Sequence, residues 1–546
     1  MAEVSEKPYL SSTRASRRRQ RGRLGALSAG LVLAMTAAVA ATACAATTAT
    51  TADAATARPA TPGHPLSPLA LGVNTAPWDS IYAANRSAGG GADVIQPLLK
   101  AAGVTLLRYG GGAYADFYDW QTNTAIDTCI WGYPYRSFIG APFRYDTTAP
   151  FTGAKCDTTK QLSFDRFASR AKAIGAHAFA TVNYGSGTPA EAAAWVSHAA
   201  GRAAGSVALW EVGNENYGCW EVNNWLARAP ENFRGYKPAD GTIVNGHGRY
   251  LTCPQSVQGV DQGMRTLATS YAVNARSFMI AMKKADPAAQ IGVPWDFPSS
   301  VRGASVAGNT EWNDTVLGQD GKYIGFVDAH WYPFAFHGAT GGGNPSDQQV
   351  LQSLMTIPAL YGQIRSELAA RDPGAGVVVG ETGVSNSATT VARTPAGALF
   401  AAGDVLSWLA AGAQSVDWWD LDPVMFSSGS PPVAQTPYYG YVLASKLAQP
   451  GAVLATMTTS APADVLAYQS SLPGGHQAVA FINTGPARTV TFSPATRLSG
   501  QLQTWTYSKG NQNAANSNIV QGTASAPSPA RGISLPAESM VILQSS

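Results

Sequence analysis

Short apolar runs alternate with helix-like stretches from about residue 67 to residue 449, and this alternation limits the fold more than any other feature. The helix-like stretches include 189–200, 261–285 and 348–370. Strands buried on both faces read as continuous apolar runs, and strands separated by helices form parallel sheets. The pattern therefore predicts an α/β protein, a (β/α)8 TIM barrel with insertions. The expected strands are Leu69–Asn74, Val104–Arg108, Ala178–Asn183, Val207–Gly213, Gln290–Pro294, Phe326–His330, Val377–Gly380 and Ser415–Trp419.

A doubly wound open sheet is the alternative. That fold often opens a helix with a glycine-rich phosphate loop after its first strand, and no such loop is present here. Gly110-Gly111-Gly112 follows the second expected strand, but it lacks the lysine of a P-loop and is interpreted as a tight turn near the site. The barrel is therefore preferred.

The pattern changes at about residue 450. Short strands with alternating apolar residues follow, separated by Gly, Pro and Asn, and no helix signal continues. These features predict an antiparallel β-sandwich domain over 450–546. We expect this domain to cap the barrel, with carbohydrate binding as the alternative.

The first 66 residues indicate export. Residues 14–23 are basic, residues 24–41 are apolar and small, and A-x-A cleavage sites follow. This predicts a secretory signal peptide over 1–45, a disordered Ala/Thr/Pro spacer over 46–66 and a barrel domain over 67–449. We expect a secreted protein with no stable membrane span after the signal is removed. A membrane anchor formed by the apolar segment and lipid attachment at Cys44 remain alternatives, and both general and twin-arginine export stay open.

Charge argues against nucleic acid as a partner. The formal net charge is +3, but residues 1–58 hold eight of the 37 basic residues and three of the 34 acidic ones. Without them the net charge is −2, and no basic face is evident. Charged residues make up 13% of the chain and aromatic residues 10%. A weakly charged, aromatic-rich surface suits neutral, hydroxyl-rich ligands such as sugars.

Four cysteines lie beyond the leader, at Cys129, Cys156, Cys219 and Cys253. Export makes disulfides the default, and four cysteines allow three connectivities. Sequence proximity favours Cys129–Cys156 and Cys219–Cys253. Each pair would staple one of two aromatic-rich insertions, 117–164 and 216–261, that follow strand ends. No C-x-x-C pair is present, and we expect neither a metal site nor a cofactor.

Two glutamates stand at the ends of expected strands. Glu215 follows the buried run in LWEVGNENYG, and Glu381 ends the run VVVGE. Barrel enzymes keep their chemistry at the carboxyl ends of the strands. Glycosidic bond cleavage needs one carboxyl held protonated and one held ionised. The two positions therefore predict a glycoside hydrolase, with the carboxyls roughly 5–5.5 Å apart if the anomeric configuration is retained.

The chain resembles the clan A retaining glycosidases, and within them the family 51 α-L-arabinofuranosidases. The Asn-Glu pair ends the fourth expected strand, and a glutamate ends the seventh. Leu107–Gly112 is similar to the family's Arg-x-Pro-Gly-Gly stretch, with Gly110 in place of the proline. Residues 181–192 resemble the family's third strand and following helix, and Asp328–Tyr332 resembles its sixth-strand His-x-Tyr. Thr-Gly-Val after Glu381 departs from the family's aromatic context at that position.

The resemblance implies a role for each matched residue. Glu215 would be the general acid/base and Glu381 the nucleophile. Asn214 would bind the sugar 2-hydroxyl, and Arg108 would keep the nucleophile ionised. Tyr332 or His330 would hydrogen-bond the nucleophile or the sugar. The remaining candidates for substrate binding are Asn183, Trp220, Trp295, Trp418 and Trp419.

Several alternatives accompany this interpretation. Glu211, on the same strand as Glu215, is expected to pair within the barrel wall. Glu381 could be only a buried ion-pair partner of Arg108. The expected substrate is an arabinose-containing polysaccharide or oligosaccharide. Other clan A activities (β-xylosidase, β-glucuronidase, endoglycanase) and a non-catalytic polysaccharide-binding protein are the alternatives.

Overall fold

The structure is a computed structural model. It describes residues 63–83, 92–125, 162–185, 187–201, 207–217, 244–245, 249–250, 257–297, 310–334, 345–372, 374–385, 391–427, 431–493, 498–508, 519–528 and 531–545. The predicted signal peptide, nearly all of the predicted spacer, Trp220 and the four cysteines expected to pair lie outside the described residues.

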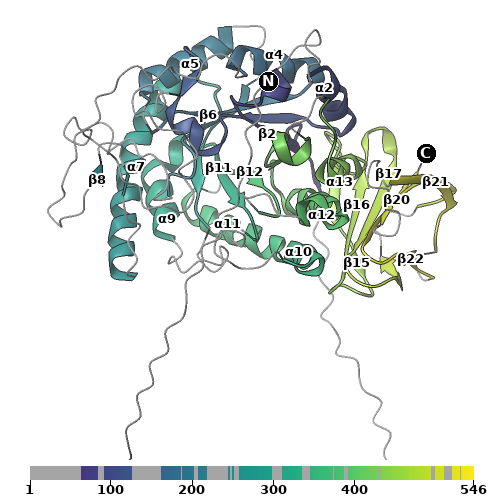
Figure 1. The fold of residues 1–546 in the computed structure, drawn as a ribbon. Helices are drawn as coiled ribbons and strands as arrows, with labels where there is room; N and C mark the ends of the chain where they lie inside the picture. Colours follow the sequence, from purple (N-terminus) through teal and green to yellow (C-terminus); the bar gives the residue numbers. More distant parts are fainter. Residues whose placement is uncertain are drawn as a thin grey trace, which may run out of the picture. The chain divides into compact units, whose positions relative to one another are not determined.

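Eight parallel strands close into a barrel, which confirms the predicted fold class. Each strand pairs in parallel with its neighbours, and β13 pairs with β2 to complete the circle. Figure 1 shows helices packed around these strands. In chain order the barrel strands are β2 (Leu71–Thr75), β3 (Leu106–Tyr109), β6 (His177–Val182), β7 (Val207–Val212), β10 (Ile291–Trp295), β11 (Phe326–Trp331), β12 (Gly376–Thr382) and β13 (Ser415–Trp418).

The barrel helices follow from their apolar spacing. In α4 (Phe164–Ile174), the buried residues Phe164, Phe167, Ala168 and Ala171 recur at the three- and four-residue spacing of one helix face. The helix ends at Gly175, whose φ of +80° suits a residue without a side chain. Within the described ranges, the helices between barrel strands also include α1 (Ser80–Ala83), α2 (Ala92–Ala101), α5 (Pro189–Gly201), α7 (Val257–Ala285), α9 (Thr310–Asp320) and α12 (Pro395–Ala411), and α13 (Thr436–Ala444) follows β13.

The stretch expected to be helical over 348–370 is helical, but the structure divides it into two α-helices. Helix α10 (Asp347–Ser353) gives way to a 3-10 turn, and α11 (Ile357–Arg371) then begins. Pro358 lies in the first turn of α11. Proline has no N–H and suits a helix start better than a helix interior, which explains the break.

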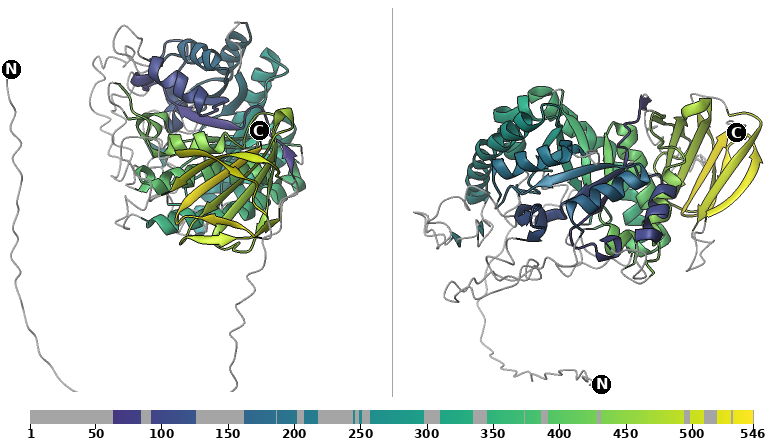
Figure 2. Two further views of the ribbon diagram at one scale, coloured as in Figure 1. Left: turned by 90° about the vertical axis from the view of Figure 1, so that its right-hand side faces the viewer. Right: turned by 90° about the horizontal axis from the view of Figure 1, so that it is seen from above.

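The C-terminal part is antiparallel, as predicted. Its main sheet has seven strands in the order β1-β14-β16-β17-β23-β20-β21, and it faces the viewer in the left view of Figure 2. The short pairs β15 (Thr458–Thr459) with β19 (Phe492–Ser493) and β18 (Arg488–Val490) with β22 (Ile533–Leu535) cover a second apolar cluster. The main strands are β1 (His64–Pro65), β14 (Val453–Thr456), β16 (Val465–Ser471), β17 (Gln477–Asn483), β20 (Gln501–Ser508), β21 (Ile519–Ser525) and β23 (Ser539–Ser545).

The end of the predicted spacer needs a correction. His64 and Pro65 form β1, which pairs with Leu454 and Val453 of β14. The spacer was expected to be disordered through residue 66, because its composition gives no strand signal. Backbone pairing with a distant edge strand orders these two residues instead.

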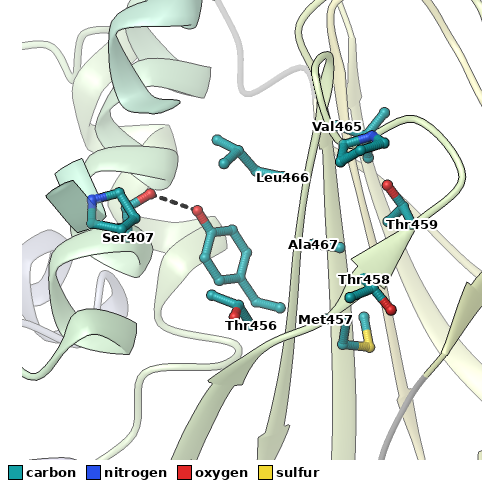
Figure 3. A pocket seen from close by; sticks show the side chains of 11 residues that line it. Ser407, Thr456, Met457, Thr458, Thr459, Val465, Leu466 and Ala467 are labelled. Atoms are coloured by element: carbon teal, nitrogen blue, oxygen red, sulfur yellow. Dashed lines mark hydrogen bonds between the residues drawn. The ribbon is translucent and has the colours of Figure 1, made fainter. Parts of the chain in front are cut away.

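Helix α12 joins the barrel to the C-terminal sheet. Its residues from Pro395 to Ala410 are all buried, as expected for a helix that is apolar on every side. Ser407 of α12 and Tyr468 of β16 share a buried hydrogen bond of 2.6 Å, drawn in Figure 3 beside a small pocket at this junction. The two parts therefore share one continuous core.

Among the described residues, no helix combines the length and apolar character that a membrane crossing would need.

Candidate active site

The barrel interior is apolar at one level and polar at the next. Leu106, Phe179, Leu209, Phe326 and Val378 form a buried apolar cluster. Two residues further along the same strands come Arg108, Thr181, Glu211, Asp328 and Gly380. Side chains two apart on a strand share a face, so this second layer lies nearer the carboxyl ends of the strands. The candidate site therefore lies over a layer that contains three charged side chains, and the apolar cluster lies beneath that layer.

Arg108 is the centre of this polar layer. Its Nη1 donates to Glu381 Oε1 at 2.8 Å and to Asn74 Oδ1 at 3.0 Å. Its Nη2 donates to Glu211 Oε2 at 2.8 Å and to Asn214 Oδ1 at 3.0 Å. The side chain is only 1% exposed. Arg108 thus holds two strand-borne carboxylates and two amide side chains in fixed positions.

Glu215 lies on a tight turn after β7. Gly213 has φ +78° and Glu215 has φ +44°, both in the left-handed region that residues with side chains rarely adopt. A Cβ on Gly213 would stand 1.9 Å from Asn216 Oδ1. The turn therefore requires glycine at 213, and it directs Glu215 off the end of the strand.

The two predicted glutamates meet at His330. His330 Nδ1 lies 2.9 Å from Glu215 Oε1 and 3.5 Å from Glu381 Oε2. The His330 nitrogen and one oxygen of each glutamate all lie within 4.8 Å of one another. The side chain of Glu215 is 21% exposed and that of Glu381 is 7% exposed. The structure therefore brings both carboxyl groups to one partly exposed site.

Tyr332 completes the surroundings of Glu381. Its hydroxyl donates to Glu381 Oε2 at 2.8 Å, while Arg108 occupies Oε1. Both oxygens of this carboxylate thus accept a hydrogen bond, which favours its anionic form. Arg108 and Tyr332, which the family resemblance implied beside Glu381, both donate to it.

Burial and neighbouring charge shift the pKa values in opposite directions. Burial raises the pKa of the Glu381 carboxyl, and His330 and Arg108 oppose that rise. Burial alone would lower the pKa of His330, but Glu381 and hydrogen bonds to Asp328 and Glu215 raise it well above its usual value. These contacts favour the protonated form of His330, which lies between the two carboxyl groups.

The absence of side chains in the turn Gly110-Gly111-Gly112 allows the Trp419 ring to lie close to the backbone. All three residues have positive φ. A Cβ on Gly112 would lie 2.9 Å from the Trp419 ring and 3.7 Å from Glu381 Oε1. Trp419 is partly buried, and its ring lies beside the Glu381 carboxylate.

The other predicted binding residues lie elsewhere or have structural contacts. Trp418 is fully buried and packs edge-on against Phe400 and Tyr441, so it belongs to the core around α12. Trp295 is 2% exposed. Asn183 accepts from the Gly187 N–H and donates to the Tyr118 carbonyl, which fixes the loop after β6.

Sequence reasoning missed several polar residues of the site. Asn74 donates to the Gly380 carbonyl at 2.6 Å, and Asp328 accepts from the Gly380 N–H at 2.6 Å. Asp116 is fully buried and accepts from the Asn216 amide at 2.8 Å. A polar residue inside an otherwise apolar strand is the signal that could have indicated Asn74 and Asp328. Asp116 lies on a loop and gives no such signal.

A metal would find ligand atoms here, at Glu215, His330 and Glu381. The two oxygens of Glu381 already accept from Arg108 and Tyr332. A guanidinium in direct contact with a ligand carboxylate would compete with a bound cation. The donor set therefore fits a hydrogen-bonded carboxylate better than a metal ligand.

Solved structures with the same architecture identify the fold. A family 51 α-L-arabinofuranosidase from Bifidobacterium longum aligns with a TM-score of 0.62 at 17% identity, over 89% of this chain and 97% of that chain. The arabinose complex of a Thermotoga maritima α-L-arabinofuranosidase aligns at 0.61 and 15% identity, over 89% and 98%. At these identities the likeness shows the fold that this chain shares with the two enzymes. A family 44 endoglucanase from Clostridium thermocellum is more distant, at 0.54 and 13% identity over 89% and 97%. No family model matches the sequence, and no curated protein does.

Proposed function

We propose that the protein is an exported retaining glycoside hydrolase with Glu215 as general acid/base and Glu381 as nucleophile. The observation that carries the proposal is the proximity of these two carboxyl groups at the ends of β7 and β12. One carboxyl oxygen of Glu215 lies within 4.8 Å of one carboxyl oxygen of Glu381. Retaining enzymes hold their carboxyls roughly 5–5.5 Å apart, whereas inverting enzymes leave about 6.5–9.5 Å for a water molecule. The separation supports retention.

The surroundings favour this assignment of roles over the reverse. Glu381 accepts from Arg108 and Tyr332 and is nearly enclosed, which suits an anionic nucleophile. Glu215 is the more exposed of the two, at 21%. A general acid/base exchanges its proton with the leaving group and with water, so access matters more at Glu215.

The reaction would proceed in two displacements. Glu381 attacks the anomeric carbon, the bond to the leaving oxygen breaks, and Glu215 gives its proton to that oxygen. Water then attacks the anomeric carbon, Glu215 takes its proton, and the bond to Glu381 breaks. Arg108, His330 and Tyr332 stabilise the Glu381 carboxylate before the first step and after the second.

We propose an arabinose-containing polysaccharide or oligosaccharide as substrate. The support is the resemblance of the strand-end motifs, together with the arabinofuranosidase structures that share the fold. The more distant glucanase likeness makes an endoglycanase the next candidate. A β-xylosidase and a β-glucuronidase are the other outcomes of the test below.

The test is hydrolysis of a panel of nitrophenyl glycosides, with the configuration of the first product read by proton NMR. We expect the α-L-arabinofuranoside to be cleaved fastest, with retention. Glu381→Ala should abolish turnover. Glu215→Ala should regain activity on an activated substrate when azide is added and should yield a glycosyl azide of retained configuration.

The matched control is Asp320→Asn, which removes a buried carboxylate that pairs with Arg276 on the outer helices. This variant should keep its activity. An inverted first product, or full activity in Glu381→Ala, would contradict the mechanism. Binding of arabinan by a protein that cleaves no glycoside would leave a polysaccharide-binding protein instead.

A further inference from the structure

The turn that carries Glu215 is held from below by a buried carboxylate. Asp116 belongs to a 3-10 segment after β3 (Gly112–Phe117) and is 0% exposed. Its Oδ2 accepts from Asn216 Nδ2 at 2.8 Å, and its Oδ1 accepts from the Gly185 N–H at 3.3 Å. The backbone amides of Asn214 and Tyr184 also donate to it. One carboxyl group thus ties together the loops after β3, β6 and β7.

The contacts with the β7 loop fall on both sides of Glu215. The N–H of Asn214 precedes Glu215, and the side-chain amide of Asn216 follows it. Asn214 is held a second time, because its Oδ1 accepts from Arg108 at 3.0 Å. Between these fixed residues Glu215 adopts a left-handed φ of +44°. A conformation of this kind persists only where surrounding contacts enforce it.

We infer that Asp116 is a positioning residue that sets the place of the Glu215 carboxyl relative to His330 and Glu381. It does not touch the glycosidic bond. It acts through the backbone of residues 214–216, so its effect falls on proton delivery by Glu215. The inference rests on the proposed function, since it concerns the acid/base of that reaction.

The chemistry of the contact explains why a carboxylate is needed at position 116. The groups around Asp116 that the structure identifies, from Asn216, Gly185, Asn214 and Tyr184, are all donors. These four hydrogen bonds favour the anion, whereas burial favours the protonated acid, and the net effect raises the pKa of Asp116 to about 8. An amide in this place would turn an NH2 group toward a donor. Asp116→Asn should therefore loosen the turn with almost no change in side-chain volume.

The experiment compares leaving groups. We measure kcat/KM of the wild-type protein and Asp116→Asn on a 2,4-dinitrophenyl glycoside, whose leaving group needs no proton, and on the matching 4-methoxyphenyl or alkyl glycoside, which does. A misplacement of about 1 Å costs about 100-fold in rate. We expect a loss of about 100-fold on the poor leaving group and less than about threefold on the dinitrophenyl substrate.

Equal losses on both substrates would overturn the inference, because a merely structural role lowers both alike. The control Asp320→Asn also replaces one oxygen of a buried carboxylate, the one that accepts from Arg276 at 2.6 Å. Its ratio of mutant to wild-type kcat/KM should be the same for both leaving groups. If the wild-type protein cleaves neither substrate, the proposed function fails.

Crystal structures decide the positioning role independently of activity. In Asp116→Asn we expect the Glu215 carboxylate to leave its 2.9 Å contact with His330. An unmoved Glu215 would overturn the inference.

Discussion

Replacing Arg108 by methionine would isolate the group that keeps Glu381 ionised. The guanidinium lies 2.8 Å from an oxygen of Glu381 and 2.8 Å from an oxygen of Glu211. Methionine keeps much of the length of the side chain but removes its charge and its donors. The substitution should therefore raise the pKa of Glu381 and leave the buried apolar cluster of the barrel interior unchanged.

The magnitude follows from the distance. Unit charges about 4 Å apart interact by about 4 kcal/mol at an effective dielectric constant of about 20. One pKa unit corresponds to about 1.4 kcal/mol, so the ceiling is about 3 units. His330 stays 3.5 Å from Glu381 and still opposes the rise in its pKa. We expect the pKa of Glu381 to rise by about 1–3 units.

The folded state should survive this change. Removing one partner of a buried ion pair costs about 3–5 kcal/mol, compared with a total stability of about 5–15 kcal/mol for a typical protein. Urea unfolding followed by circular dichroism would show a lower midpoint with a single transition. The remaining carboxyls can also take up protons, which limits the loss at low pH.

The assay is the pH dependence of kcat/KM on an activated aryl glycoside, whose acidic limb reports the ionisation of the nucleophile in the free enzyme. In Arg108→Met this limb should move about 1–3 pH units toward alkaline pH. Arg108→Lys is the matched control, because its ammonium keeps the charge but cannot reach both glutamates as the guanidinium does. A smaller shift is expected there. An acidic limb of Arg108→Met that superimposes on the wild-type curve would refute the reasoning.

Two further predictions concern single hydrogen bonds. Tyr332→Phe removes a 2.8 Å donor to Glu381. A hydrogen bond to a charged group is worth about 1.5–3 kcal/mol, so kcat/KM should fall about 10- to 100-fold. A loss of less than twofold would show that Arg108 suffices to stabilise the Glu381 carboxylate. Ser407→Ala and Tyr468→Phe each break the 2.6 Å bond between α12 and β16, so each should lower the unfolding free energy by about 1 kcal/mol without changing kcat/KM. Denaturant unfolding of the two single variants and the double variant measures their coupling, and strictly additive effects would mean that the bond contributes nothing.

The barrel could be predicted because its signal is repeated. Each parallel strand is buried on both faces and therefore reads as a short apolar run, and the chain repeats that run with helices between. Local errors in single elements leave such a pattern intact. The division of residues 347–371 into α10 and α11 shows the limit, because the only local signal for it is Pro358 in the first turn of α11.

The pairing of β1 with β14 could not be predicted from the same kind of evidence. His64 and Pro65 contribute two residues with no alternation to detect. Their position depends on backbone pairing with an edge strand almost 400 residues away in sequence. A short strand of this kind is specified by its partner and not by its own side chains.

The residues of the candidate site also differ in whether a local sequence signal indicates them. Glu215 and Glu381 were found because a charged residue at the end of an apolar strand is conspicuous, and Arg108 was indicated by the family resemblance. Asp116 was missed because it lies on a loop, where polar residues are ordinary. Its importance comes from four donors on two other loops, those after β6 and β7, an arrangement that exists only after the barrel has closed.

The barrel interior holds more carboxyl groups than cations, and this excess gives the site its chemistry. Glu211, Asp328 and Asp417 lie below Glu381, while Arg108 and His330 supply the positive charge among these neighbours. Burial raises the pKa of Asp417 well above its usual value, and the Ser415 hydroxyl is the first group to oppose that rise. Glu381 has Arg108, His330 and Tyr332 against the same effect. Two cations and a hydroxyl therefore oppose the effect of burial at Glu381, whereas at Asp417 the Ser415 hydroxyl is the first group to do so. Environments that separate the ionisation of nearby acids in this way are what a two-carboxyl mechanism requires.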